Sequence, residues 1–176
     1  MSTFDFSTLS PDLMLDALFH YGFDVSSGLL QLNSFENRVC QFRDDDRKSW
    51  VVKFYRPERW SLEQLNEEHQ FVRELADIEV PVAEAVERDG QQVLSYGGFY
   101  LSVFPSRGGR TLEPDNDDQM LQLGRFLGML HQVGAARPFP RAASRTWRGS
   151  RHGRPPPTGV GRLWPQRRAA GQPRVP

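Results

Sequence analysis

The fold is indicated most clearly by a short stretch of the chain, WVVKFYRP at residues 50–57. Its first six residues are aromatic or β-branched with one exception, Lys53, and this composition is typical of a β-strand. Pro57 ends the run, because proline cannot donate a backbone hydrogen bond to a sheet. A lysine inside an apolar strand is costly unless it is paired, so the same stretch predicts a functional site as well as a strand.

Further strands are predicted on both sides of this stretch, from short apolar runs bounded by turn residues. Asp89-Gly90 is a strong hairpin signal, and it should turn a strand around Val86 back into Val93-Leu94. With the two arms of this hairpin counted as one strand, five strands in one antiparallel sheet are expected in all. The remaining strand segments are residues 29–32, 39–42, 50–55 and 99–104.

Helices are predicted from caps and from helical spacing. Ser10-Pro11 begins the first helix and Gly22 ends it, while Ser61 and Gln64 form a capping box that begins the second. A helix after the third strand and another after the fifth make the fold class a mixed α+β lobe. The face of the second helix that should meet the sheet carries Leu65, Glu68, Phe71, Val72 and Leu75. The third helix begins near Asp115 or Asn116. Its apolar stripe should stay exposed and consists of Met120, Leu123, Leu127 and Leu130.

Lys53 and Glu68 form the pair of greatest chemical interest. The helix that carries Glu68 should pack on the sheet that carries Lys53, so the two side chains can neutralise each other beneath a nucleotide, with the lysine at its phosphates. From spacing alone a second arrangement is equally compatible, in which Lys53 lies on the solvent face of its strand and Glu68 at a charged helix edge.

The turn from Ser34 to Arg38 is a candidate phosphate-binding loop. It could cover phosphates with backbone N–H groups and with the Ser34 hydroxyl. It contains no glycine and matches neither the Walker motif nor the glycine-rich loop of protein kinases. An ordinary hairpin turn is therefore the alternative interpretation.

The chain carries six characteristic segments, at residues 32–39, 51–60, 67–71, 80–83, 98–100 and 104–110. Together they resemble the N-terminal lobe of the bacterial stress response kinase A family. The resemblance covers about residues 4–139, and the block from Lys53 to Trp60 is its most specific part. It implies an aminoglycoside-phosphotransferase-like kinase fold and ATP-dependent Ser/Thr protein phosphorylation, with Mg²⁺, in a cytoplasmic stress response.

The resemblance also implies roles for individual residues. It implies that Ser34 contacts ATP, that Lys53 holds the phosphates and that Glu68 pairs with Lys53. The segment around Phe104 is implied to be the hinge beside the adenine, offering backbone hydrogen bonds. The implied nucleotide-binding residues are Ser34, Asn37, Lys53, Glu68 and Phe104.

The catalytic loop of such kinases is absent from this sequence. The family supplies it as His-Gly-Asp-x-His-x-x-Asn, followed by an Asp-rich strand, and these residues orient the substrate hydroxyl and bind magnesium. None of the four histidines is followed two positions later by Asp, and no Asp or Glu follows Asp118. We therefore expect no catalytic residues, no metal ligands, and a truncated chain that is inactive by itself and binds ATP weakly. Its protein substrate, and whether it is an enzyme at all, stay open.

The composition changes sharply at residue 137. Residues 1–136 hold 12 basic and all 22 acidic side chains, a net charge of −10, whereas residues 137–176 hold ten arginines and no acid, a net charge of +10. With 8 of the 13 prolines and few large apolar residues, the second segment is expected to be disordered. We therefore predict a kinase-like N-terminal lobe at residues 1–136 and an Arg/Pro/Gly-rich tail at residues 137–176.

Three explanations compete for this tail. A frameshift in a GC-rich gene would produce Arg, Pro, Gly and Ala in excess, and the loss of family resemblance at the composition change favours it. A genuine tail would make the protein a nucleic-acid- or partner-binding protein that acts by charge, with Trp147 and Trp164 available for stacking. The third explanation is a pseudokinase regulator.

Cysteine content and hydropathy exclude several classes of protein. Cys40 is the single cysteine, which excludes an intramolecular disulfide and a multi-cysteine metal site, and its position in a strand predicts burial. No segment is long and apolar enough to span a membrane, and residues 1–10 lack the basic region of a signal peptide. These observations predict a cytoplasmic protein without a membrane partner.

Overall fold

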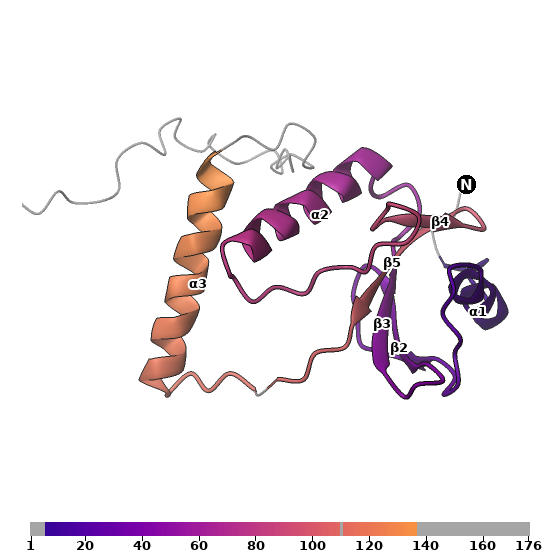
Figure 1. Ribbon diagram of the computed structural model, residues 1–176, viewed down its shortest axis with the longest axis horizontal. Coiled ribbons are helices and arrows are strands. Elements are labelled where there is room, and N and C mark those ends of the chain that lie inside the picture. Colours follow the sequence, from indigo (N-terminus) through magenta and orange to yellow (C-terminus); the bar gives the residue numbers. More distant parts are fainter. Residues whose placement is uncertain (1–5, 110, 137–176) are drawn as a thin grey trace, which may run out of the picture. The chain divides into compact units, whose positions relative to one another are not determined.

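A computed structural model of the chain describes residues 6–109 and 111–136 (Figure 1). The described part forms a five-stranded antiparallel sheet in the order β1-β2-β3-β5-β4, together with three helices, which confirms the predicted α+β class. The predicted tail at residues 137–176 lies outside the described residues. The elements are α1 (Pro11–His20), β1 (Leu30–Gln31), β2 (Arg38–Arg43), β3 (Ser49–Phe54), α2 (Leu62–Asp77), β4 (Leu94–Tyr96), β5 (Phe99–Pro105) and α3 (Asp117–Ala136).

The helix starts agree with the caps predicted from sequence. The Ser10 hydroxyl accepts a hydrogen bond from the Leu13 N–H, and Ser61 and Gln64 satisfy each other's backbone N–H groups in a capping box. The side-chain oxygen of Asn116 accepts from the Gln119 N–H and so caps α3. Local backbone chemistry alone was enough to place these three boundaries.

The strand predicted around Val86 does not form. Its turn does, with Asp89 and Gly90 both at positive φ and Arg88 bridged to Gln91. Beyond that bridge the two arms of the hairpin separate. Val86 packs against the hydrophobic core that includes α1, whereas Val93 packs with Tyr55 and with Leu65 of α2. The Val86 N–H donates to the Val103 carbonyl at 2.7 Å, which is its contact with β5.

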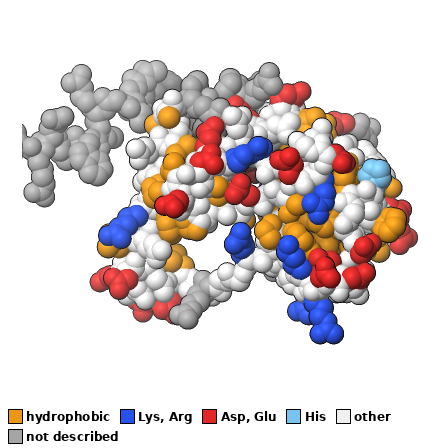
Figure 2. All heavy atoms as spheres, in the orientation of Figure 1, with side chains coloured by type: hydrophobic (Ala, Val, Ile, Leu, Met, Phe, Trp, Pro, Cys, Tyr) orange, Lys and Arg blue, Asp and Glu red, His pale blue; other side chains and the backbone are white. Residues whose placement is uncertain are grey.

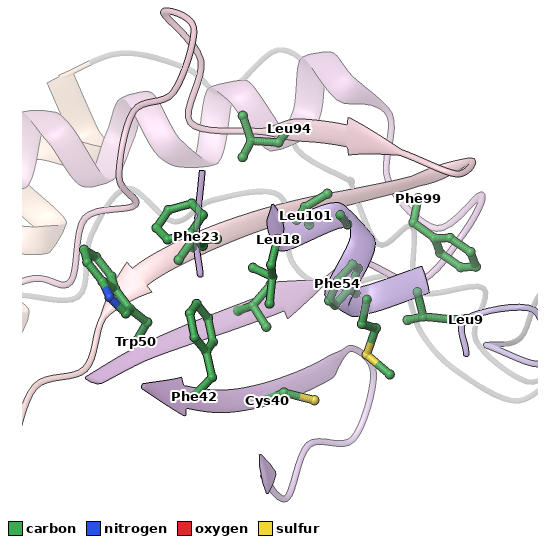
Figure 3. Close-up of a cluster of buried hydrophobic side chains, with 14 residues drawn as sticks. Leu9, Leu18, Phe23, Cys40, Phe42, Trp50, Phe54, Leu94, Phe99 and Leu101 are labelled. Carbon is green, nitrogen blue, oxygen red and sulfur yellow. The ribbon is translucent and has the colours of Figure 1, made fainter. Parts of the chain in front are cut away.

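The side chains of β3 point alternately to the two faces of the sheet, and each face packs against a different helix. Successive side chains of a strand point to opposite faces, and in β3 they alternate between half-buried and buried. One face packs against α1 in the main core (Figure 3). That core includes Met14, Ala17 and Leu18 of α1, Cys40 and Phe42 of β2, Trp50, Val52 and Phe54 of β3, and Leu101 and Val103 of β5. The burial predicted for Cys40 is confirmed.

The other face packs against α2 through a buried polar network. The Ser102 hydroxyl donates to the Gln92 carbonyl at 2.8 Å and accepts from the Tyr55 hydroxyl at 3.3 Å. His69 Nε2 lies 2.8 Å from the Tyr55 hydroxyl oxygen and 3.2 Å from Ser102 Oγ, so the three side chains form one hydrogen-bonded cluster. Each of these buried polar side chains thereby has a hydrogen-bond partner, as buried polar groups require.

The prediction that Glu68 lies on the buried face of α2 is wrong. His69 is the buried residue, together with Leu65 and Leu75, whereas the Glu68 side chain is 51% exposed. A step of four residues, from Leu65 to His69, turns by about 40° around the helix, whereas the step of three to Glu68 turns by about 60° in the opposite sense. The sheet packs on the side of the helix that carries Leu65 and His69. Glu68 is therefore at the rim of the α2 interface.

α3 leaves apolar side chains exposed, as the sequence predicted. None of its side chains is buried, and Leu123, Leu127 and Leu130 are all exposed, while Met120 is half-buried. Figure 2 shows hydrophobic side chains along this helix. Within the described part of the chain, none of the helices has the length and hydropathy needed to cross a membrane.

Truncating the core should destabilise the domain far more than truncating its surface. Leu18 is 0% exposed and the neighbouring Phe19 is 73% exposed. Leu18→Ala should lower the free energy of unfolding by about 3 kcal/mol, because it leaves a cavity in a packed core. Urea denaturation measures this, and Phe19→Ala is the matched control. Equal losses for the two variants would contradict the described core.

Stability should also depend on the protonation of His69. Burial lowers the pKa of His69, so below about pH 6.5 the unfolded chain binds a proton that the folded chain does not bind. The free energy of unfolding should therefore fall with decreasing pH, by at most about 1.4 kcal/mol per pH unit, until the folded-state pKa is reached.

Urea denaturation at pH values from about 7.5 down to about 5 checks this slope. His69→Gln should flatten it, because glutamine does not titrate there. His20→Gln, which replaces an exposed histidine of α1, is the control variant. If His69→Gln keeps the wild-type slope, His69 is not the group responsible.

Candidate functional site

Lys53 of β3 and Glu68 of α2 meet at the rim of the α2 interface. Lys53 Nζ lies 3.4 Å from Glu68 Oε1, and the lysine side chain is 24% exposed. The ammonium group also lies 4.5 Å from the centre of the Tyr55 ring, a favourable cation–π position. Glu68 lies at the edge of its helix, as the arrangement with both residues toward solvent predicted. The two side chains nevertheless form an ion pair, as the nucleotide-binding arrangement predicted. The lysine is thereby held along the sheet face.

A mixed apolar face surrounds the lysine on the α2 side of the sheet. In the strand register Lys53 lies between Val39 of β2 and Ser102 of β5, and the next row on this face is Gln41, Val51 and Phe104. All of these except the buried Ser102 are half-buried. The Phe104 ring stacks on the His69 ring, with centres 6.0 Å apart and an interplanar angle of 21°. A flat aromatic group can lie on such a surface beside the ammonium group.

The loop at residues 33–37, between β1 and β2, is closed by its own side chains. The Ser34 hydroxyl donates to the Asn37 carbonyl, and Asn37 Oδ1 accepts from the Arg56 N–H at 3.3 Å. The Ser34 hydroxyl and the Asn37 side chain are thus hydrogen-bonded to other groups of the protein. Phe35 at the tip of the loop is fully exposed. No hydrogen bond or ion pair between described residues links this loop to Lys53 or Glu68.

Sequence reasoning missed two features that shape the site. His69, Tyr55 and Ser102 hold α2 on the sheet, and the four-residue step from Leu65 to His69 was the available signal for the histidine. The ion pair between Arg59 Nε and Glu36 Oε1 had no signal in the sequence, because 23 residues separate its members.

The described residues do not provide a metal site. They include no group of three or more His, Cys, Asp or Glu side chains that could hold a metal ion. A Mg²⁺ ion in a kinase site is held by carboxylate and amide oxygens together with phosphates, and here Glu68 is committed to Lys53. The residues present therefore do not fit a magnesium ion.

A hollow of about 640 Å³ lies between α2 and the turn at Asp89-Gly90, and His69 is one of its lining residues. Its lining is polar, with Asn66, Gln70, Arg73 and Gln92 among the residues, and it contains none of the five predicted nucleotide-binding residues. Size alone does not make it the site, and two of its charged lining groups already have partners: the Arg73 guanidinium donates to Gln92 Oε1 at 3.2 Å, and Glu74 Oε1 accepts from Gln70 Nε2 at 3.5 Å. The face around Lys53 is the better candidate.

Comparison with known proteins identifies the family. Residues 28–169 match the phosphotransferase enzyme family (APH), a match that continues past residue 137, so the boundary placed there remains a prediction. Stress response kinase A of Escherichia coli (strain K12) is 56% identical over 138 residues, which are 78% of this chain and 42% of the relative. The serine/threonine protein kinase RdoA of Salmonella typhimurium has the same identity and coverage.

The fold has a solved counterpart. Amicoumacin kinase hAmiN, in complex with AMP-PNP, Ca²⁺ and Ami, aligns with a TM-score of 0.62 and 22% identity over 76% of this chain and 42% of that one. A likeness at this identity shows a shared fold. The chain spans less than half the length of the curated relatives it matches. It belongs to the phosphotransferase enzyme family and is a homologue of stress response kinase A, as the sequence segments predicted.

Proposed function

We propose that this domain binds ATP on the sheet face around Lys53, as the nucleotide-binding part of a Ser/Thr protein kinase. The observation that carries the proposal is the Lys53–Glu68 ion pair of 3.4 Å on a half-buried, partly apolar face. The names of the relatives, and AMP-PNP in the hAmiN complex, support the choice of ATP.

Each residue of this face has a role in the proposal. Lys53 holds the phosphates, since an ammonium group is a compact donor for phosphate oxygens, and Glu68 keeps it in place. Val39 and Val51 pack against the adenine, with Phe104 at its hinge side. Ser34 and Asn37 act indirectly, because the bonds from Ser34 to Asn37 and from Arg56 to Asn37 shape the 33–37 loop. The backbone N–H groups of the loop then meet the phosphates.

Phosphoryl transfer is a separate matter from ATP binding. Transfer needs a carboxylate that orients the nucleophile and carboxylate or amide ligands for magnesium, and their stabilisation of the developing charge dominates the rate. The 176 residues offer no Asp or Glu after Asp118, and the described part has no metal cluster. The proposal therefore assigns ATP binding to this chain and no transfer by the chain alone.

Lysine labelling tests ATP binding with unusual clarity, because Lys48 and Lys53 are the only lysines in the sequence. An acyl-phosphate derivative of ATP should acylate Lys53, and excess ATP should protect it. Lys48 is the internal control, since its ammonium group lies 4.1 Å from the centre of the Trp50 ring, a side chain of the opposite, core face. Mass spectrometry of the two peptides gives the result. Equal labelling of both lysines, unaffected by ATP, would exclude the site.

Calorimetry should give the matching affinities. Lys53→Ala should weaken ATP binding by about tenfold, because it removes a charge-assisted contact to phosphate. Lys48→Ala removes the same charge elsewhere and should leave the affinity unchanged. Equal ATP affinity for the two variants would refute the assigned role of Lys53.

Transfer can be tested with radiolabelled ATP. The purified 176-residue chain should incorporate no more phosphate into itself or into a generic Ser/Thr substrate than its Lys53→Ala variant does, because the residues for transfer are absent. Incorporation well above that variant would show that the chain is a kinase by itself.

A further inference from the structure

The segment after β3 contains a strained turn. The Arg59 N–H donates to the Arg56 carbonyl at 3.3 Å, with Pro57 second and Glu58 third in the turn. Glu58 has φ of +57°, the left-handed region that a type II turn requires at its third residue and that glycine adopts most easily. A glutamate persists in such a conformation when the surrounding contacts hold it there.

Those contacts join the turn to the 33–37 loop. The first residue of the turn gives its N–H to Asn37 Oδ1, and the last, Arg59, forms the ion pair with Glu36. The Arg59 guanidinium also lies 5.6 Å from the centre of the Trp60 ring. The turn thus holds the loop at two adjacent positions, and it follows directly from the strand that carries Lys53.

We propose that the Glu36–Arg59 ion pair is a positioning contact for nucleotide phosphates. It holds the 33–37 loop at a set distance from Lys53, so that loop and lysine can act on the same phosphate groups. The inference rests on the ATP-binding function proposed above. Arg59 is a positioning residue here, since it acts through Glu36 and the loop.

Electrostatics makes the pairing necessary as well as useful. Glu36 is an anion in the loop that is to approach the phosphates, and an unpaired carboxylate there would repel them. Arg59 neutralises it, so loss of Arg59 both releases the loop and exposes the repulsion. Loss of Glu36 releases the loop without adding repulsion, and the arginine should therefore matter more than the glutamate.

The test compares ATP with adenosine on the full chain by calorimetry. Arg59→Gln should weaken ATP binding by about fivefold, the upper end for an exposed ion pair, and Glu36→Gln by less. Adenosine affinity should not change, because adenosine has no phosphate. Arg43→Gln is the matched control, since it removes the same charge from an exposed arginine at the end of β2.

The charge-swapped variant Glu36→Arg/Arg59→Glu separates positioning from direct contact and from misfolding. Restored ATP affinity in the swap, with the single variants weakened, supports the inference. It is overturned if the swap stays as weak as Arg59→Gln, because then the arginine contacts phosphate directly or the fold is lost. It is also overturned if Arg59→Gln behaves like Arg43→Gln, or if adenosine affinity falls as much as ATP affinity.

Failure of the underlying function gives a different result. If the wild-type chain binds ATP no better than adenosine, and Lys53→Ala has no effect, the proposed ATP site and the positioning role both fail. If Lys53→Ala weakens ATP binding and Arg59→Gln does not, only the positioning role fails.

Discussion

The alternation of β3 is the constraint on which the rest of the domain depends. A central strand is paired on both sides, so its side chains have only two directions available. Trp50, Val52 and Phe54 take one face and fill the core against α1. Lys53 is left on the other face with Tyr55, where a charge is tolerable only beside a partner and close to solvent.

α2 meets that second face through two parallel contacts. Lys53 and Tyr55 are two residues apart on one strand face, and Glu68 and His69 are adjacent on the helix, so one docking geometry brings both pairs together. The Tyr55–His69 contact is buried, and Ser102 extends it to the Gln92 carbonyl. Since a half-satisfied buried network is unfavourable, the helix has a preferred position on the sheet. The rim pair between Lys53 and Glu68 follows from that position.

The loop between β1 and β2 is also positioned by contacts between distant residues. Residues 33–37 contain no proline to restrict the backbone and no glycine to shape a phosphate-binding turn. Its conformation comes from contacts with itself and with the turn after β3, namely Ser34 to Asn37, Asn37 to Arg56 and Glu36 to Arg59. The strained backbone conformation is that of Glu58, which lies in the supporting turn and outside the loop.

Sequence reasoning succeeded where the information was local and failed where it was not. The caps at Ser10 and Ser61 and the burial of Cys40 depend on near neighbours, and all were predicted. The strand around Val86 was predicted from a correct turn, but the two arms of that hairpin are drawn to opposite faces of the sheet. The error over Glu68 and His69 has a similar origin, because residues three and four positions after Leu65 both neighbour it on the helix surface, and only the surface packed against the helix decides which of them is buried.

The sequence by itself determined the helices, the strands other than the segment around Val86, the two faces of β3 and the presence of a lysine that needed a partner, since caps, turns and alternation act over a few residues. Only the tertiary structure decided how far Glu68 is buried, that His69 completes the polar network, and that Glu36 meets Arg59. The contacts among Tyr55, His69 and Ser102 join residues 14 to 47 positions apart, and the ion pair at the loop joins residues 23 positions apart. They depend on how helix, sheet and loop pack, and no local propensity encodes that packing.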